Sequence, residues 1–266
     1  MAPQDAIFAA TNRIADDAAE RMLAILDAVS DEIADLMDEI DPLKVADRDR
    51  AELRNLTLVR KQVQAVLTRE GIAAATDVAE DMAADMAAEI AGILHMGDFD
   101  ADATRELERI LRGQTREIEK TFGEAAREIG RAIDAGQLTS GKALRQATEE
   151  VAQKLRTSFV RASTAVEAAI AGTSRAAVVS LAEGAEAETG QEFVFLYSGP
   201  ADSHTRPFCR EHVGKAYTRA RLDADGRAAG VKPQPASVFA GGYACRHSLA
   251  PLLVEDAEEE GIEIVR

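Results

Sequence analysis

The sequence predicts a mainly α protein, with a long helical-bundle-like N-terminal body followed by a small α+β, loop-rich C-terminal module. Two distributions along the 266 residues support this fold class. No proline occurs between Pro42 and Pro200, and a span without proline permits uninterrupted helices because proline removes a backbone donor and clashes with the preceding turn. Seven of the eleven Phe and Tyr residues lie between Phe193 and Tyr243, together with four prolines. The chain therefore changes character near residue 190.

Residues 1–97 are expected to form long, acidic, coiled-coil-like antiparallel helices. The clearest apolar stripe has spacings of three and four and consists of Ile14, Ala18, Met22, Ile25, Val29, Ile33, Leu36 and Ile40. Asp41-Pro42 is predicted to end this first helix. Two shorter stripes follow, and we expect them to end near Gly71 and Gly97.

Residues 98–190 are predicted to be an Ala-rich helical region that leads into the C-terminal module. Asp102 or Thr104 is expected to cap one helix, and Ser140 is expected to cap the next. The stretch from 160 to 188 consists largely of small side chains, which bury little area each. We therefore expect its stability to come from extended helix contacts or from oligomeric partners.

The C-terminal module is predicted to span residues 191–254, with an acidic tail at 255–266. The run from Glu192 to Tyr197 is rich in residues that favour strands, and a Ser-Gly-Pro turn follows it. Further short strands are expected at 216–218 and 249–254.

The charge of the chain limits the classes of function. A net charge of −16 and a pI of about 4.8 argue against a protein that coats nucleic acid through a basic surface. Residues 193–254 differ from the rest, because they carry eight basic against four acidic side chains. We find neither a signal peptide nor a run of 18 apolar residues, which predicts folding in a reducing cytoplasm and no membrane-spanning segment. Two cysteines in such a compartment are expected to be thiols or metal ligands.

Two polar features of the helical body are expected to have structural roles only. Asp98, Asp100 and Asp102 alternate as at the start of a calcium loop, but Ala103 and Arg109 stand where an EF-hand requires glycine and glutamate. A solvated loop with capping aspartates is the favoured interpretation. His95 is expected to interact with the carbonyl end of its helix.

The C-terminal module holds a candidate metal site. Cys209 and His212 form a C-x2-H pair, Cys245 and His247 form a C-x-H pair, and 32 residues separate the two pairs. Thiolate and imidazole are ligands that Zn²⁺ prefers, and four of them close a tetrahedral structural site. The residues leave a second interpretation open, in which Cys209 and Cys245 pack side by side as small buried thiols without a metal.

Asp202 and Arg206 flank a turn that they are predicted to lock. An aspartate can accept backbone amides, and an arginine can reach a carboxylate or carbonyls. Asp202, His204 and Cys209 could instead be drawn as a nucleophile with its base. We favour the structural lock, since such triads are defined by geometry and not by neighbouring sequence. No catalytic or cofactor-binding residue is assigned beyond the possible zinc ligands.

A family resemblance rests on these C-terminal residues. The chain reads Asp202-Ser-His-Thr-Arg-Pro-Phe-Cys209-Arg-Glu-His-Val-Gly214-Lys-Ala-Tyr217, then Gly241-Gly-Tyr-Ala-Cys245-Arg-His247, and later Pro251. This pattern resembles the signature of the Mu F-like minor head proteins of tailed bacteriophages, also called phage head morphogenesis proteins. The likeness covers roughly residues 140–254, whereas the first 140 residues match no family that we can name. The chain departs from the pattern by closing with Cys-Arg-His, where a Cys-Arg-Cys form also occurs, and by having Leu249 at a position that is often aromatic.

The resemblance implies a structural virion protein without catalytic activity. Such proteins lie in the head interior or at the portal vertex, are present in few copies, and act in head morphogenesis or in DNA ejection. Portal protein, other head or connector proteins and packaged DNA are the partners that it implies, with the host cytoplasm as the place of assembly. A zinc-dependent hydrolase or a toxin-like effector built on the same module is the alternative, because F-like domains also occur joined to toxins.

Overall fold

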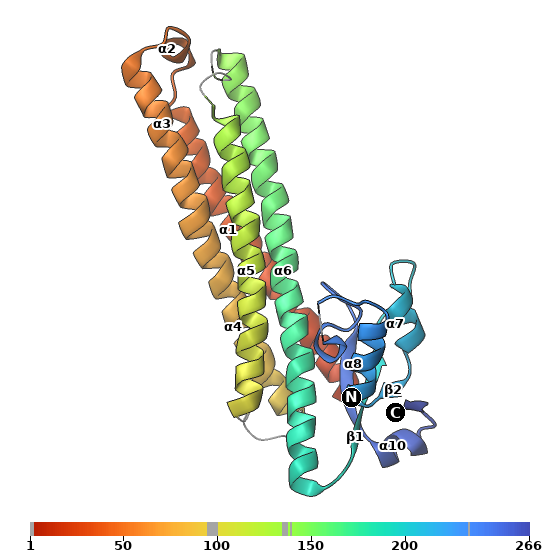
Figure 1. The fold of residues 1–266 in the computed structure, drawn as a ribbon. Helices are drawn as coiled ribbons and strands as arrows, with labels where there is room; N and C mark the ends of the chain where they lie inside the picture. Colours follow the sequence, from red (N-terminus) through yellow and green to blue (C-terminus); the bar gives the residue numbers. More distant parts are fainter. Residues whose placement is uncertain (1–2, 95–100, 135–137, 139, 234) are drawn as a thin grey trace. The chain divides into compact units, whose positions relative to one another are not determined.

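The computed structural model describes residues 3–94, 101–134, 138, 140–233 and 235–266. Long helices precede a small four-stranded sheet near the C-terminus, which confirms the predicted mainly α fold class with a small α+β module (Figure 1). The long helical elements are α1 (Pro3–Asp38), α3 (Arg50–Ala65), α4 (Ile72–Leu94), α5 (Ala101–Ala132) and α6 (Gly141–Thr189). The short helix α2 (Pro42–Ala46) follows the predicted stop at Asp41, whose side chain accepts hydrogen bonds from the amides of Leu43 and Lys44.

The chain divides into two compact units whose boundaries cross the long helices. We call residues 18–78 and 115–166 the helical unit, and residues 1–17, 79–114 and 167–266 the sheet-bearing unit. The divisions expected from composition, at 97/98 and 190/191, stay predictions, and the first of them lies outside the described residues.

The helical unit is built from buried apolar stripes. The predicted first stripe is buried here at Ala18, Met22, Val29, Ile33 and Ile40. Phe122 of α5 meets Phe159 of α6 edge to face, with ring centroids 4.8 Å apart. The hydroxyl of Ser140 accepts a hydrogen bond from the amide of Ala143 at 3.2 Å, at the start of α6.

One predicted helix end does not occur. The chain continues through Gly71 in a π-helical turn, η1 (Val66–Gly71), which joins α3 directly to α4. Gly71 lies against the Phe122 ring, and a Cβ there would stand 3.1 Å from that ring. The glycine therefore permits close packing against an aromatic side chain instead of ending the helix.

The sheet has the strand order β3-β1-β2-β4. Strand β1 (Phe193–Ser198) pairs antiparallel with both β2 (Ala216–Tyr217) and β3 (Ser248–Leu253), and β2 pairs in parallel with β4 (Ile264–Val265). The short helices α7 (Pro207–His212), α8 (Arg219–Ala228) and α9 (Ala236–Phe239) lie in the connections. All four strands therefore join segments that stand far apart in the sequence.

The predicted acidic tail is part of this module. Helix α10 (Val254–Glu259) and strand β4 both lie beyond the expected boundary at residue 254. Ala257 is completely buried and forms a cluster with Val194 and Ala216, against which Ile262 and Ile264 pack. The apolar residues scattered among the glutamates therefore determine the structure of this segment, and the module extends to the strand at 264–265.

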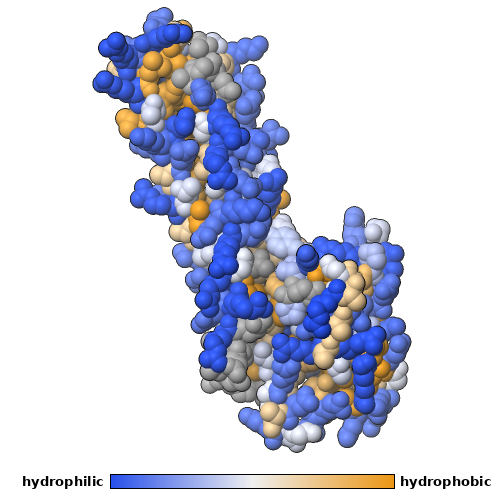
Figure 2. Space-filling model, viewed as in Figure 1, coloured by the Kyte–Doolittle hydropathy of each residue, from blue (hydrophilic) through white to orange (hydrophobic). Residues whose placement is uncertain are grey.

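Hydrophilic side chains predominate on the face of the molecule seen in Figure 2, and hydrophobic ones appear in smaller groups among them. One helix in the described part of the chain, α6, is long and apolar enough to cross a membrane by length and composition. Of its apolar window, 83% is buried inside the protein, as in the core helix of a soluble protein. The absence of a membrane-spanning segment thus stays a prediction.

Candidate metal centre

Three of the four predicted zinc ligands lie together. Cys209 comes from α7, while Cys245 and His247 come from the segment that leads into β3. Their ligand atoms all lie within 4.8 Å of one another, and all three residues are buried. This cluster could hold a metal ion.

The spacing of the sulfurs suits a shared cation. The two Sγ atoms stand 3.5 Å apart, and Nδ1 of His247 is 3.5 Å from Sγ of Cys245. Both cysteines are free thiols, since a disulfide would bring the sulfurs to about 2.05 Å. Two sulfurs bound to one tetrahedral zinc at about 2.3 Å lie roughly 3.8 Å apart. The observed separation is close to that value.

Neighbouring groups donate hydrogen bonds to both sulfurs. The hydroxyl of Tyr197, on β1, donates to Sγ of Cys209 at 3.3 Å, and the amide of Gly241 donates to Sγ of Cys245 at 3.3 Å. A Cβ at Gly241 would come within 2.1 Å of Sγ of Cys209, so only glycine fits there. Donors of this kind stabilise sulfur that carries negative charge and orient it toward a metal.

The two thiols differ strongly in acidity. The hydrogen bond between them lowers the pKa of Cys245 and raises the pKa of Cys209. His247 and Arg175 add to the lowering at Cys245, which burial opposes. Burial raises the pKa of Tyr197, which keeps its hydroxyl a donor. The surroundings of Cys245 therefore favour the deprotonated sulfur that a metal requires of its ligand.

Arg175 of α6 fixes the segment that carries two of the three ligands. Its Nε donates to the carbonyl of Val238, and its Nη1 donates to the carbonyls of His247 at 2.6 Å and Cys245 at 3.4 Å. The residue is only 3% exposed, and burial lowers its pKa. This guanidinium therefore connects the Ala-rich helix to the metal-ligand segment.

His212 is not brought into the cluster. Its Nδ1 lies 2.7 Å from the carbonyl of Phe208, and its ring is stacked between Phe208 and Tyr217, with centroids 3.9 and 4.8 Å away. Its Nε2 is 3.5 Å from a carboxylate oxygen of Asp225. The predicted set of four ligands is thus reduced to three, because the C-x2-H spacing turns this imidazole toward its own helix and the sheet.

Asp202 and Arg206 hold the turn by separate contacts. Asp202 accepts from the amide of His204 at 2.9 Å, and its two oxygens pair with Arg246 at 2.7 and 2.8 Å. Arg206 does not reach Asp202 but donates to the carbonyls of Gly241 and Tyr243. Both contacts connect the Asp202 turn to the segment that carries Cys245.

The sequence contained a signal for Arg175 that was not used. It is the single charged residue between Glu167 and Glu183, in an otherwise apolar and small-residue stretch. A lone charge in a buried helix needs internal partners. Tyr197 and Gly241 carried no comparable signal, because their roles depend on where the two sulfurs lie.

Two predicted features of the helical body concern residues outside those that the structure describes, namely His95 and the Asp98–Asp100 pair. Asp102 and Thr104 lie inside α5, so neither is the residue that precedes the helix.

Comparison of the chain with models of known protein families, with curated proteins and with solved structures found no match.

Proposed function

We propose that this chain is a structural minor head protein of a tailed phage virion, located at the portal vertex and acting in head morphogenesis or genome ejection. In this proposal it assembles with portal protein and with other head or connector proteins. The metal cluster holds a structural zinc ion, and the chain has no catalytic role.

The observation that carries the proposal is the convergence of the Mu F-like pattern in one module. Asp202 pairs with Arg246, 44 positions later, and Arg206 binds the carbonyl of Gly241. Cys209 meets Cys245. Asp202, Arg206 and Cys209 therefore all contact the same short loop, at residues 241–246. A folded docking module requires such mutual contacts among the residues of its sequence pattern.

Charge pairing within the module favours a protein partner over DNA. Four of the eight basic side chains of residues 193–254 are in ion pairs: Lys215 with Glu263, Arg219 with Glu183, Arg221 with Asp225, and Arg246 with Asp202. Side chains that are already neutralised release few counterions from a phosphate backbone. Contact with packaged DNA is accordingly a minor part of the proposal.

The donor set supports zinc as the metal. Cys209, Cys245 and His247 offer two sulfurs and one imidazole nitrogen, which are the donors zinc prefers. Nε2 of His247 is buried without a hydrogen-bond partner in the described part of the chain. A small module with a loop-rich core gains stability from such a cross-link, because metal binding energy becomes folding energy.

The enzyme alternative has one observation in its favour, which is that three protein ligands leave a coordination position open. Two features weigh against it. The donors are at most 5% exposed, and the nearby carboxylates Asp202 and Asp225 are engaged by Arg246 and Arg221. A hydrolase needs a substrate path to the metal and an available base.

Co-purification tests the proposal. The tagged full-length chain is co-expressed with the portal protein encoded in the same genome, and bound protein is identified by mass spectrometry. We expect portal protein to be recovered, and a Cys209→Ser/Cys245→Ser double variant to lose it. Glu258→Gln, at an exposed position, serves as the matched control and should retain the portal. Absence of the chain from purified virions, or of a portal gene from its genome, would contradict the proposal.

A further inference from the structure

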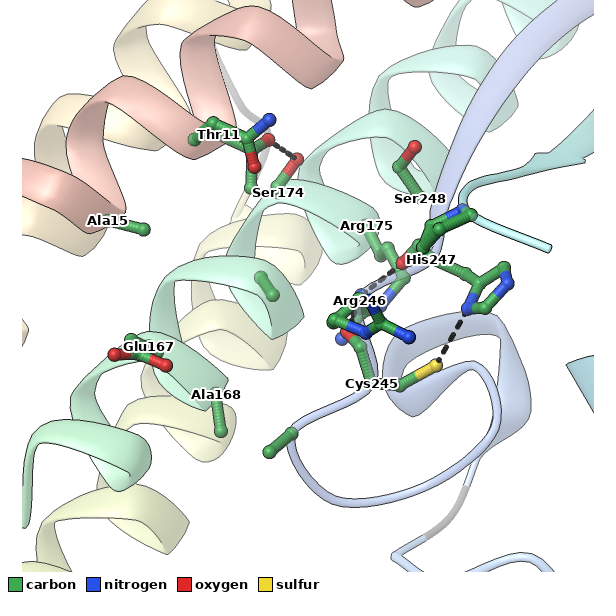
Figure 3. Close-up of a pocket in the computed structure, with 14 residues that line it drawn as sticks. Thr11, Ala15, Glu167, Ala168, Ser174, Arg175, Cys245, Arg246, His247 and Ser248 are labelled. Atoms are coloured by element: carbon green, nitrogen blue, oxygen red, sulfur yellow. Dashed lines mark hydrogen bonds between the residues drawn. The ribbon is translucent and has the colours of Figure 1, made fainter. Parts of the chain in front are cut away.

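A cavity in the sheet-bearing unit lies beside the metal-ligand segment. Its volume is about 370 Å³, and it is lined by residues of α1 and α6, by Pro200 and by residues 244–248 (Figure 3). Cys245 and His247 are also among the lining residues, and in this view the sulfur of Cys245 and the ring of His247 point away from α1. A volume of this size suits a small organic molecule.

One nitrogen of a buried guanidinium remains available to this cavity. Arg175 lines it, and its Nε and Nη1 atoms are taken by backbone carbonyls. No hydrogen bond engages Nη2 within the described residues, although the side chain is almost fully buried. The carbonyls that bind this desolvated guanidinium carry no formal charge, and its Nη2 can still form a charge-assisted hydrogen bond with an anion, which little water screens.

The rest of the cavity lining favours a ligand whose main part is apolar. Four alanines contribute walls of small side chains, and Pro200 adds another apolar surface; the alanines are Ala15, Ala168, Ala171 and Ala244. Thr11 and Ser174 stand at hydrogen-bonding distance from each other, 3.2 Å between hydroxyl oxygens. Of the two arginines in the lining, Arg246 is paired with Asp202, so Arg175 is the cation that a ligand in the cavity would meet.

From this arrangement we infer that the cavity binds a small organic carboxylate, with the anionic group at Nη2 of Arg175 and its apolar body against the alanines. A phosphate-rich polymer fits this lining poorly, because the walls are mostly apolar and the exposed carboxylate of Glu167 belongs to the lining. This site is separate from the proposed virion role and does not depend on it.

Matched acid and amide probes test this site. The full-length chain, labelled with ¹⁵N, is titrated with 3-phenylpropanoate and with 3-phenylpropanamide, which share size and shape but differ in charge. We expect the acid to bind at least tenfold more tightly and to shift the amide signals of Ser174 and Ser248. Equal affinity for the two probes, or shifts elsewhere only, overturns the proposal.

Two variants isolate the cavity without touching the bonds of Arg175. Asn12→Asp adds a negative charge at an exposed cavity position and should weaken acid binding at least tenfold, whereas Asn12→Gln should not. Ala171→Phe should fill the space and abolish binding of both probes, while Ala185→Phe, on the same helix outside the lining, should leave it intact. Binding that survives both Asn12→Asp and Ala171→Phe also overturns the proposal.

A peptide arm distinguishes the source of the carboxylate. A tetrapeptide ending in phenylalanine is titrated as the free acid and as the C-terminal amide. Tighter binding of the peptide acid than of 3-phenylpropanoate assigns the occupant to a chain terminus, and weaker binding assigns it to a free organic acid. Both results support a carboxylate site, and a peptide amide that binds as well as the acid contradicts it.

Discussion

The two histidines of the predicted metal set have different surroundings, and this difference predicts different effects on zinc binding. His247 lies beside Sγ of Cys245, whereas His212 is held between two aromatic rings and bound to its own helix. If the cluster holds zinc as proposed, we expect the wild-type chain purified without added metal to contain it and His247→Ala to lack it. His212→Ala should retain it. Elemental analysis by mass spectrometry measures both, and equal loss in the two variants would restore the four-ligand set.

The Asp202–Arg246 pair predicts a pH-dependent contribution to stability. The hydrogen bonds from Arg246 hold the pKa of Asp202 well below its usual value near 3.8. A carboxyl whose pKa is depressed by folding stabilises the protein above its unfolded-state pKa, and this contribution is lost as the pH falls through the folded-state value.

Asp202→Asn should therefore be less stable than the wild type in urea unfolding at pH 7 and at pH 5, and the difference should shrink below about pH 4. Arg246→Gln should reproduce the same curve, because it removes the partner of the same pair. A difference that persists undiminished at pH 2 would show that the carboxylate charge is not responsible.

Residue types indicated the metal cluster, and the structure adds the groups around it. Cysteine and histidine are rare in this chain, so their gathering near the C-terminus marked a site. The separate placement of His212 and the role of Tyr197 depend on which way each side chain leaves its element. The spacing of residues along the sequence does not predict these side-chain directions, because they result from the packing of β1 against α7.

At the scale of elements, the Gly241 loop is the most constrained connection of the module. A Cβ at Gly241 would stand 2.1 Å from Sγ of Cys209 and 3.4 Å from Sγ of Cys245. Gly241→Ala should displace the sulfurs, with loss of zinc and a stability cost of about 1–3 kcal/mol. Gly184→Ala on α6 is the control, because a Cβ there meets nothing within 4 Å, and it should stabilise by roughly 0.5–1 kcal/mol. Unchanged zinc content in Gly241→Ala would contradict the close approach.

The burial of one residue of helix α10 leads to a second prediction, which concerns stability. Ala257 is fully buried against Val194 and Ala216, so Ala257→Asp places an unpartnered carboxylate in an apolar cluster. We expect a loss on the order of 3 kcal/mol in the free energy of unfolding. The neighbouring Glu258→Asp is exposed and should have little effect. Near-wild-type stability of Ala257→Asp in thermal unfolding would instead support a separate acidic tail.

Helical elements were predicted more completely than their ends. The apolar stripe of α1 and its stop before Pro42 follow from local periodicity and proline chemistry. The continuation through Gly71 and the strand at 264–265 do not, because each depends on a distant partner: the ring of Phe122 in one case and β2 in the other. Glycine and glutamate are only statistically typical of ends and tails, and tertiary contacts override that preference.

At the scale of the whole molecule, the division into two units crosses α1, α4, α5 and α6. Composition alone placed the boundaries between helices, since it detects changes in residue type along the chain. The structure divides the chain by which segments pack together, and one helix can contribute to both units. The sheet-bearing unit contains Cys209, Cys245, His247 and Arg175, so loss of the proposed metal should act on that unit first.

Removal of zinc tests this expectation through amide hydrogen exchange. Stability is not uniform across a structure, and a metal supplies local folding energy to the segments that hold it. After treatment with a chelator, we expect faster exchange in residues 193–253 and unchanged protection in the helical unit, at residues 18–78 and 115–166. The Cys209→Ser/Cys245→Ser variant, which has no sulfur ligands to lose, should show no further change on chelation. Faster exchange throughout both units would mean that the zinc stabilises the entire chain as one cooperative structure. Unchanged exchange in residues 193–253 would mean that the cluster does not stabilise the module through a metal.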